Sequence, residues 1–210
     1  MNIVLLAVSI ILTYLIGAIP TAYIFGRLLK KIDIREHGSG NVGATNAFRV
    51  LGKGPGTVVL LIDILKGIIP TTILANIFGL NNPLMLVIIG LVAVAAHNWT
   101  VFLSFKGGKG IATTLGVLIG LTIQIPGLRG VLLTVLLTWL GVFLVFGYVS
   151  LASLVAAVVF PICMVSVNAP FVLIAMSIVL CIFIVFRHRS NITRLLQGKE
   201  SRVSLPFLKK

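Results

Sequence analysis

The segment "PLMLVIIGLVAVAAHNWTVFL", from Pro83 to Leu103, decides the class of fold because it contains no Asp, Glu, Lys or Arg. A helix that crosses the hydrocarbon core of a bilayer needs about 20 predominantly apolar residues, and this segment has that length. The 210-residue chain as a whole is 59% hydrophobic and only 10% charged, with a mean hydropathy of +1.18. An average soluble domain carries about a quarter charged residues. The sequence therefore predicts an all-α polytopic membrane protein.

Working outward from this segment, further apolar runs are separated by proline and glycine, which start helices or form turns. Seven transmembrane helices are predicted, at 3–26, 56–78, 83–103, 111–127, 131–147, 150–168 and 170–186. The fourth is short, so its first turns can belong to the preceding loop. Residues 1–26 lack the basic start and small-residue cleavage site of a signal peptide, which favours a first transmembrane helix. Residues 1–210 are interpreted as one integral membrane domain with a tail at 187–210.

The distribution of charge gives a predicted orientation. The chain has 17 Lys and Arg against 4 Asp and Glu, a net charge of +13. In a soluble protein this excess would suggest nucleic acid, but all the basic residues except Lys66 and Arg129 lie in three segments. These are a first loop (Arg27, Lys30, Lys31, Arg35, Arg49, Lys53), a third loop (Lys106, Lys109) and the tail (Arg187, Arg189, Arg194, Lys199, Arg202, Lys209, Lys210). With seven spans, all three lie on one face, which the positive-inside rule makes cytoplasmic. The N-terminus is then outside and the C-terminus inside, with the bilayer as partner and no nucleic acid.

The first polar segment is "GSGNVGATN", residues 38–46. Glycines allow backbone N–H groups to turn inward and approach an anion closely. Side-chain donors come from Ser39, Asn41, Thr45 and Asn46, and Arg49 adds a forked cation suited to phosphate. The glycines fit G-x-G-x-x-G, but no strand precedes them, so a dinucleotide fold is not indicated. The segment predicts a phosphate cradle, and a flexible connector is the alternative.

The second polar segment is "FKGGKGIATT", residues 105–114, in which a Gly-Gly pair lies between two lysines and a helix is expected to follow. Glycine amides, a helix N-terminus and Lys109 together favour an anion site. Gly110 follows Lys109 where a Walker loop has Ser or Thr, so nucleotide hydrolysis is not predicted. The alternative is a turn that carries ordinary positive-inside lysines.

The third polar segment is "FRHRSNITRLLQGKE", residues 186–200, which leaves the last predicted span. His188 and Asn191 are spaced i, i+3 and share a helix face, with several arginines beside them. Alone, the segment is typical of a basic cluster that contacts anionic lipid head groups. Taken with the other two, it predicts one cytoplasmic pocket for two anionic groups.

Polar residues inside the predicted spans have structural interpretations. Asp63 and Lys66 are three residues apart, and an ion pair makes their burial tolerable. His97 is predicted to be a hydrogen-bonded interior residue. Cys163 and Cys181 are predicted to be packing residues with no disulfide. The 3 His and 4 acidic residues show no metal-ligand spacing, so no metal site is predicted.

"GSGNVGATNAFRVLGK", "FKGGKGIAT" and "RHRSNITRLLQGKE" resemble the three cytoplasmic motifs of the bacterial acyl-phosphate-dependent glycerol-3-phosphate acyltransferases, and "YVSLAS" at 148–153 extends the resemblance. Two departures concern helix ends. Where the family commonly has Gly-His and then proline, this chain has Ala96-His97-Asn98-Trp99-Thr100, and Gly147 replaces a basic residue common in the family. The resemblance runs to about Glu200.

The resemblance implies transfer of an acyl group from acyl phosphate to the 1-hydroxyl of sn-glycerol 3-phosphate, giving lysophosphatidic acid and phosphate at the bacterial inner membrane. No cofactor or metal is implied. The residues implied in catalysis are Ser39, Asn41, Arg49, Lys109, His188 and Asn191. Those implied in binding substrate phosphates are Gly40, Thr45, Asn46, Lys106, Gly107, Gly108, Gly110, Arg187 and Arg189.

Within this scheme Arg49, Lys109 and the Gly107–Gly108 amides are expected to clamp phosphates, and His188 or a substrate phosphate is the general base. No histidine is followed by Asp in the His-x4-Asp pattern of the other large glycerolipid acyltransferase class. An organic-phosphate transporter or channel is the alternative function, and a scaffold that binds lipid head groups is a third. Acyl-chain preference, order of substrate binding and oligomeric state, a monomer included, are left open.

Overall fold

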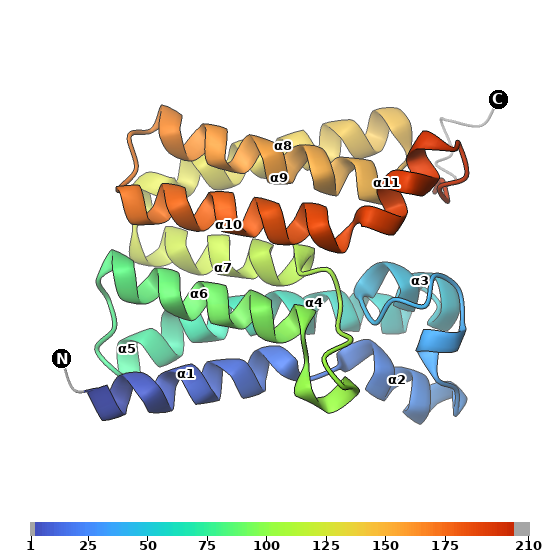
Figure 1. Cartoon of the computed structure of the whole chain (residues 1–210), viewed down its shortest axis with the longest axis horizontal. Helices are drawn as coiled ribbons and strands as arrows, with labels where there is room; N and C mark the ends of the chain where they lie inside the picture. The colour runs from blue at the N-terminus through green and yellow to red at the C-terminus, as the bar shows by residue number, and fades with distance from the viewer. Residues whose placement is uncertain (1–2, 204–210) are drawn as a thin grey trace. The chain divides into compact units, whose positions relative to one another are not determined.

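The computed structural model describes residues 3–203, and all regular structure in that range is helical (Figure 1). These residues form two compact units, one up to Pro126 and one from Gly127 onward. Lys209 and Lys210, counted above in the basic tail, lie outside the described residues.

The first unit contains most of the elements. Its α-helices are α1 (Ile3–Ala18), α2 (Thr21–Lys30), α3 (Ala44–Leu51), α4 (Lys53–Ile69), α5 (Ala75–Ile77), α6 (Pro83–Asn98) and α7 (Ile111–Gln124). Shorter turns are η1 (Ile34–Glu36), the π-helical η2 (Pro70–Leu74) and η3 (Val101–Leu103), and η4 (Pro126–Leu128) leads into the second unit. Helix α1 packs on α6, and α4 packs on α7.

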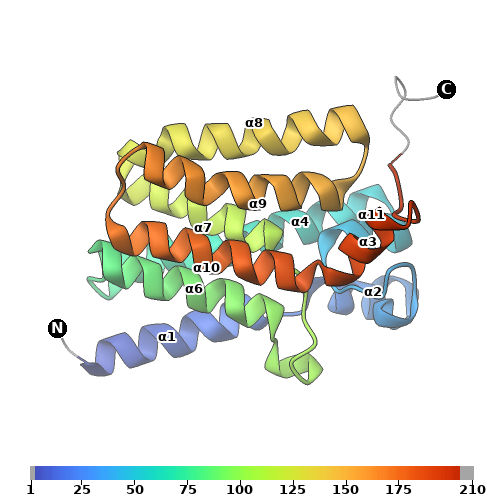
Figure 2. The same cartoon turned by 45° about the horizontal axis from the view of Figure 1, so that its top comes forward.

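The second unit consists of three long helices and a short one. They are α8 (Arg129–Phe146), α9 (Val149–Ser166), α10 (Phe171–Arg187) and α11 (Arg189–Leu196). Figure 2 shows α9 lying between α8 and α10, in agreement with its contacts to both. The prediction that residues 170–186 form a helix is confirmed, and the chain turns by 60° into α11 where the basic residues begin.

Residues 3–26, predicted as one span, form two helices that meet at an angle of 40°. The break lies at Pro20, the N-cap of α2, whose ψ of 74° is not helical. Proline lacks an amide donor and its ring clashes with the preceding turn, so the helix cannot run through this position unchanged.

The architecture is that of an all-α integral membrane protein with four to six candidate spans among the described residues. Four segments are long and apolar enough to cross a bilayer: Lys53–Ile77, Pro83–Leu103, Pro126–Phe146 and Val149–Ser166. The bent pairs α1–α2 and α10–α11 raise the number to six when each is taken as one span. Helix α7, which corresponds to the predicted span at 111–127, is apolar but has only 14 residues. The predicted total of seven spans therefore requires that α7 also crosses the bilayer.

Packing in the first unit relies on small residues where α4 crosses α7. A Cβ on Gly116 would collide with the backbone of Ile64 and lie 3.1 Å from the Cα of Gly67. Helices in membranes use such small residues to approach closely. Across the same contact, the Thr113 hydroxyl donates to the Asp63 carbonyl at 3.0 Å. Helix α7 is therefore held tightly to α4, and with it the loop that precedes α7.

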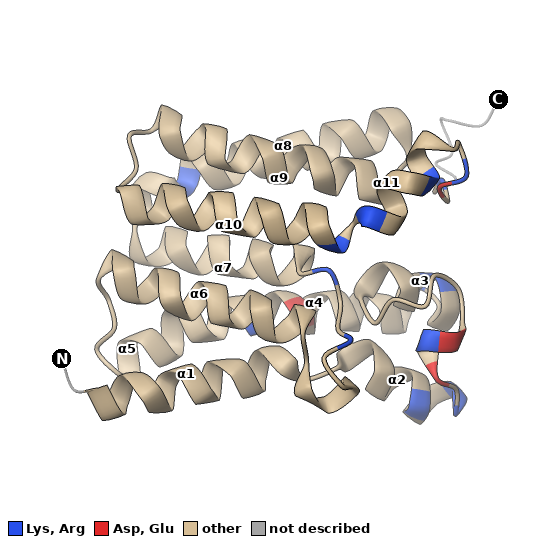
Figure 3. Ribbon diagram, viewed as in Figure 1, with Lys and Arg blue, Asp and Glu red and all other residues tan. Residues whose placement is uncertain are grey.

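Charged residues gather at one end of the helices in each unit (Figure 3). In the first unit most lie around α2, η1, α3 and the loop before α7, with Asp63 and Lys66 inside α4 as the exceptions, and in the second unit most lie around α11. Arg129, at the start of α8, is the exception in the second unit. By contrast, only 11% of the most apolar window of Pro126–Phe146 is buried, as expected for a helix whose sides face lipid.

Candidate functional site

The first motif is a loop followed by a short helix, and Asn46 holds the two together. This residue lies in α3 and is 1% exposed. Its Oδ1 accepts a hydrogen bond from the Ser39 amide at 2.8 Å, while its Nδ2 donates to the carbonyls of Ile34 (3.2 Å) and His37 (3.0 Å). Both amide hydrogens are thus used within the protein. In this conformation Asn46 fixes the loop, which differs from the phosphate contact expected of it.

Glycine is required at two positions of this loop. Gly38 and Gly40 have φ angles of 62° and 70°, in the left-handed region that glycine adopts without steric cost. A Cβ on Gly38 would collide with the Asn46 side chain and lie 2.9 Å from Val50 Cγ2. The glycine pattern therefore serves the tight turn that brings the Ser39 amide to Asn46.

The remaining polar side chains of the first motif lie at the surface. Ser39 is exposed and Asn41 is half-buried in the loop, whereas Thr45 and Arg49 lie on α3 and are exposed. Thr45 and Arg49 are four residues apart, so they share a face of the helix. That Thr45 and Arg49 contact a substrate phosphate stays a prediction.

Asp33 organises the basic residues ahead of the loop. Its carboxylate accepts from Arg35 Nη2 at 2.6 Å and from Arg27 Nη2 at 3.2 Å. Both guanidinium groups also lie over the Tyr23 ring, each 5.2 Å from its centroid. The hydrogen bond from Arg35, together with the charges of Arg35 and Arg27, lowers the pKa of Asp33 to about 2. The carboxylate is therefore ionised at neutral pH and keeps these two arginines in place.

In the second motif, Gly107 and Gly108 bind the end of α6. The Gly107 amide donates to the Asn98 carbonyl at 3.1 Å and the Gly108 amide donates to the His97 carbonyl at 3.0 Å. A Cβ on either glycine would collide with His97. These amides are used within the protein, so the expectation that they clamp a phosphate does not match this geometry. The Gly-Gly pair is explained by the close approach of the loop to α6.

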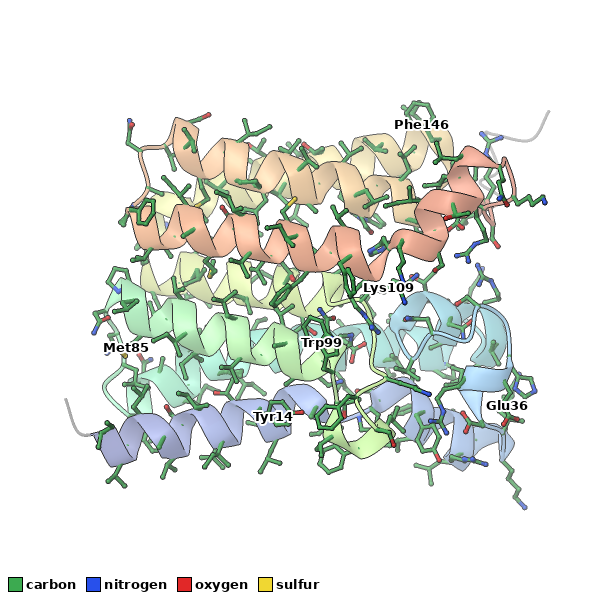
Figure 4. The ribbon with its side chains drawn as sticks, in the orientation of Figure 1. Tyr14, Glu36, Met85, Trp99, Lys109 and Phe146 are labelled. Atoms are coloured by element: carbon green, nitrogen blue, oxygen red, sulfur yellow. The ribbon has the colours of Figure 1, made fainter. Side chains whose placement is uncertain are left out.

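Lys106, Lys109 and Gly110 lie on the segment between η3 and α7, and Lys109 is labelled in Figure 4. Lys106 is exposed, and Lys109 is half-buried. Gly110, with φ of 80°, is the N-cap of α7. Lys109 therefore lies directly before the positive end of a helix, where backbone N–H groups and the lysine reinforce each other as an anion site. Below it, the Asn98 side chain is fully buried, and neither of its polar atoms has a hydrogen-bond partner.

Contacts to α1 hold the segment that joins α6 to η3. The Tyr14 hydroxyl donates to the Trp99 carbonyl at 2.8 Å, and the Thr100 hydroxyl donates to the Ala18 carbonyl at 2.5 Å. Tyr14 and Trp99 are labelled in Figure 4. Three helices, α1, α6 and α7, thus fix the backbone on which Lys109 lies.

A buried ion pair lies beneath the second motif. Lys66 Nζ is 2.5 Å from Asp63 Oδ1, and both side chains are 2% exposed. Lys66 also donates to the Ile19 carbonyl at 2.7 Å and to the Thr21 hydroxyl at 2.5 Å. His97 Nδ1 is 3.9 Å from the same Asp63 oxygen. The predicted structural pair is therefore present, and it connects α4 to the broken junction between α1 and α2.

The third motif contains a buried histidine and a buried asparagine. His188 is 4% exposed, and its Nδ1 lies 2.8 Å from the Ile184 carbonyl. A carbonyl only accepts, so Nδ1 carries the proton in this bond, and Nε2 is the acceptor nitrogen of the neutral ring. Asn191 is 6% exposed and donates from Nδ2 to Glu200 Oε1 at 2.6 Å.

Glu200 is a residue whose role the sequence analysis missed. Its Oε1 also accepts from the Ser150 hydroxyl, and its Oε2 accepts from Arg194 Nε, both at 2.7 Å. Burial raises the pKa of Glu200, but the hydrogen bonds from Asn191, Ser150 and Arg194 together outweigh burial, and the net shift is downward. The sequence contained a signal that could have drawn attention to Glu200, because it is the only acidic residue after Asp63.

The two other arginines of the third motif differ in exposure. Arg187 is half-buried at the end of α10, and Arg189 is exposed with its guanidinium 5.3 Å from the centroid of the Phe186 ring. Ser39, Asn41, Arg49 and Lys109 belong to the first unit, whereas His188 and Asn191 belong to the second. The pocket shared by all three motifs stays a prediction. Among the described residues, no three His, Cys, Asp or Glu side chains gather as a metal site requires.

Comparisons with known proteins place the chain in a family. The family described as Glycerol-3-phosphate acyltransferase matches residues 7–198. The Glycerol-3-phosphate acyltransferase of Fusobacterium nucleatum subsp. nucleatum is 45% identical over 193 residues, which cover 92% of this chain and 95% of the relative. That of Staphylococcus haemolyticus is 41% identical over 209 residues, covering 95% of this chain and 98% of the relative.

Solved structures also match this chain. PlsY (YgiH), an integral membrane glycerol 3-phosphate acyltransferase, in its glycerol 3-phosphate form matches with a TM-score of 0.85 and 42% identity, covering 95% of this chain and 96% of that chain. Its lysophosphatidic acid form matches with a TM-score of 0.82 and 41% identity, covering 95% of each chain. The transporter and scaffold alternatives are set aside, because the matched proteins are acyltransferases. This chain belongs to the glycerol-3-phosphate acyltransferase family of integral membrane enzymes.

Proposed function

We propose that this enzyme transfers an acyl group from acyl phosphate to the 1-hydroxyl of sn-glycerol 3-phosphate, releasing lysophosphatidic acid and inorganic phosphate. The observation that carries the proposal is the half-buried Lys109 directly before the N-terminus of α7, on a loop anchored to α6. Membership of the family supports the acceptor and the lipid product. The phosphate donor is supported by the three basic motifs, which suit two phosphate groups.

The chemistry needs no acyl-enzyme, because acyl phosphate is already an activated mixed anhydride. The acceptor oxygen forms a bond to the acyl carbonyl carbon, and the bond from that carbon to the phosphate oxygen breaks. Negative charge that develops on the carbonyl oxygen and the leaving phosphate is stabilised by preorganised donors. Lys109 and Arg49 are cations suited to phosphate, and Ser39 and Asn41 are donors for the carbonyl oxygen or the leaving group.

His188 and Asn191 orient glycerol 3-phosphate in this proposal. The hydroxyl proton passes either to Nε2 of His188 or to a substrate phosphate. The geometry of His188 supports the first route, because Nδ1 donates to the Ile184 carbonyl and Nε2 is the acceptor. The two routes differ in the His188→Ala variant. Loss of the base lowers kcat by about 10²–10⁴-fold, whereas loss of an orienting contact mainly raises KM for glycerol 3-phosphate.

The proposed topology has seven spans, including α7, with the N-terminus outside and the active site facing the cytoplasm of a bacterial inner membrane. Its support is the distribution of Lys and Arg and the positive-inside rule. Glycerol 3-phosphate then reaches the enzyme from the cytoplasm, and the acyl donor reaches it from the bilayer. No cofactor or metal takes part.

The function is tested with detergent-purified protein, glycerol 3-phosphate and palmitoyl phosphate, by following phosphate release and lysophosphatidic acid. A parallel reaction contains palmitoyl-coenzyme A. We expect product only from acyl phosphate, and a fall of at least 10²-fold in kcat/KM for Lys109→Ala, in line with loss of a preorganised electrostatic group. Lys199→Ala is the matched control, because Lys199 is an exposed lysine that is not among the residues predicted to act in catalysis or to bind substrate phosphates. Equal turnover with the thioester would overturn the proposed donor.

A further inference from the structure

The segment Ser201–Val203, called here the strap, folds back onto the corner between α8 and α9. The Val203 amide donates to the Gly147 carbonyl at 2.9 Å. Arg202 Nε donates to the Phe146 carbonyl at 2.9 Å, and its guanidinium carbon lies 6.0 Å from the centroid of the Tyr148 ring. Two hydrogen bonds and one aromatic contact therefore attach the strap to residues more than fifty positions earlier in the chain.

The corner is suited to this contact. Phe146 is the last residue of α8, and the final carbonyls of a helix lack partners within the helix and carry its negative end. The Arg202 guanidinium supplies both a donor and a positive charge there. Gly147 has φ of 75°, and a Cβ at this position would lie 2.9 Å from Arg202 Cγ. Glycine at position 147 thus permits the left-handed backbone conformation that ends α8, and its lack of a side chain leaves room for Arg202.

The strap continues directly from Glu200, the carboxylate that binds the Asn191 amide at 2.6 Å. The same oxygen of Glu200 accepts from the Ser150 hydroxyl, and its other oxygen accepts from Arg194 Nε, each at 2.7 Å. The chain reaches Glu200 from α11 through a turn at Gly198, whose φ is 66°. The strap contact adds to these bonds: it attaches the backbone that follows Glu200 to the corner, which limits how far the carboxylate can move away from Asn191.

We propose that the strap is a positioning element for the glycerol 3-phosphate site and that Arg202 is its main positioning residue. By anchoring the chain at the end of α8, the strap fixes Glu200, and Glu200 fixes the amide of Asn191. In this proposal none of the three strap residues contacts substrate, and the strap acts only through Glu200 and Asn191. The inference rests on the proposed function, in which Asn191 orients glycerol 3-phosphate.

The first test compares kinetic constants of full-length variants. Arg202→Ala removes the cap of α8, and Arg202→Ala/Val203→Pro also removes the amide donor, because proline has no N–H. Each hydrogen bond contributes about 1 kcal/mol, so we expect KM for glycerol 3-phosphate to rise roughly five-fold in the single variant and more in the double variant. KM for palmitoyl phosphate should stay unchanged. Arg202→Lys, which keeps the charge, should lie between, and Lys199→Ala should match the unmodified chain.

The second test separates positioning from general stability. The dissociation constant for glycerol 3-phosphate is measured for Arg202→Ala, Asn191→Ala and the double variant, since binding needs no turnover. If the strap acts through Asn191, then Arg202→Ala has no further effect once Asn191 is Ala, and the two changes are not additive. Additive losses, equal rises in both KM values, or an unchanged KM for glycerol 3-phosphate would each overturn the inference. An unmodified chain inactive with acyl phosphate would overturn the proposed function instead.

Discussion

At the scale of single residues, Asp33 gives the protein a defined sensitivity to acid. Its pKa of about 2 lies below the usual carboxyl value of about 3.9, chiefly because Arg35 donates to it. The unfolded chain therefore binds this proton at a higher pH than the folded chain does. Between pH 4 and 2 protonation favours unfolding. The stabilising effect of Asp33 is complete above about pH 4 and is lost as the pH falls through about 2.

The Asp33→Asn variant tests this argument. At pH 7 we expect its thermal unfolding midpoint in detergent to be roughly 2–4 °C below that of the unmodified chain, the shift that about 1 kcal/mol causes in a domain of this size. The difference should disappear between pH 4 and 2. Glu36→Gln is the matched control, since Glu36 is an exposed carboxyl in the same segment. A difference that persists at pH 2 would show that Asp33 acts through shape and not through charge.

At the scale of elements, the contact between α4 and α7 determines where the lysine loop lies. Gly116 is in the middle of α7, and an added Cβ would collide with the Ile64 carbonyl oxygen of α4, so a methyl group has no room. Gly116→Ala is expected to destabilise the enzyme by about 1–3 kcal/mol, the usual effect of overpacking, and to lower activity because α7 begins next to Lys109. Gly141→Ala is the control. It lies in α8, and apart from its own stretch of helix an added Cβ would have no atom within 4 Å, so this change should not lower stability and should leave turnover unchanged. Thermal unfolding and phosphate release measure both.

Local sequence signals account for most of the helices, because long apolar runs and their proline and glycine boundaries are properties of neighbouring residues. They do not account for the contacts that define the site. The amides of Gly107 and Gly108 were expected to bind phosphate, yet they pair with carbonyls of α6 that lie nine and eleven residues earlier in the chain. Asn46 was expected to face substrate but binds the backbone of its own loop. The composition of a loop indicates that it can bind an anion. It does not indicate which of its donors are already hydrogen-bonded within the protein.

The same limit applies to the third motif. The i, i+3 spacing of His188 and Asn191 was visible in the sequence, and both side chains are buried. The partner of Asn191 is Glu200, nine residues later, and it meets Asn191 only because the chain reverses after α11. A reversal at Gly198 is compatible with the sequence, but the sequence does not show that the chain then meets the end of α8 through Arg202.

At the scale of the whole molecule, α7 decides the number of membrane crossings. It has 14 residues, which span about 21 Å at 1.5 Å per residue, less than the roughly 30 Å of a hydrocarbon core. Gly110 and Ile125 continue the apolar run at its two ends, but two more helical residues would add only about 3 Å, so a crossing by α7 also requires local thinning of the bilayer. If α7 crosses, Lys53 and Arg129 lie on opposite faces of the membrane. If it does not, they lie on the same face, because only the segments Lys53–Ile77 and Pro83–Leu103 separate them.

Single cysteines at these two positions distinguish the cases. Cys163 and Cys181 are first replaced by Ala, and Lys53→Cys and Arg129→Cys are made separately, since both native residues are exposed. Intact spheroplasts are treated with a membrane-impermeant maleimide, and lysed spheroplasts serve as the control for reactivity. Seven spans with a cytoplasmic site predict labelling of Arg129→Cys in intact cells and of Lys53→Cys only after lysis. Protection of both positions would mean that α7 does not cross, and the charge distribution would then place Arg129 with the other basic residues inside.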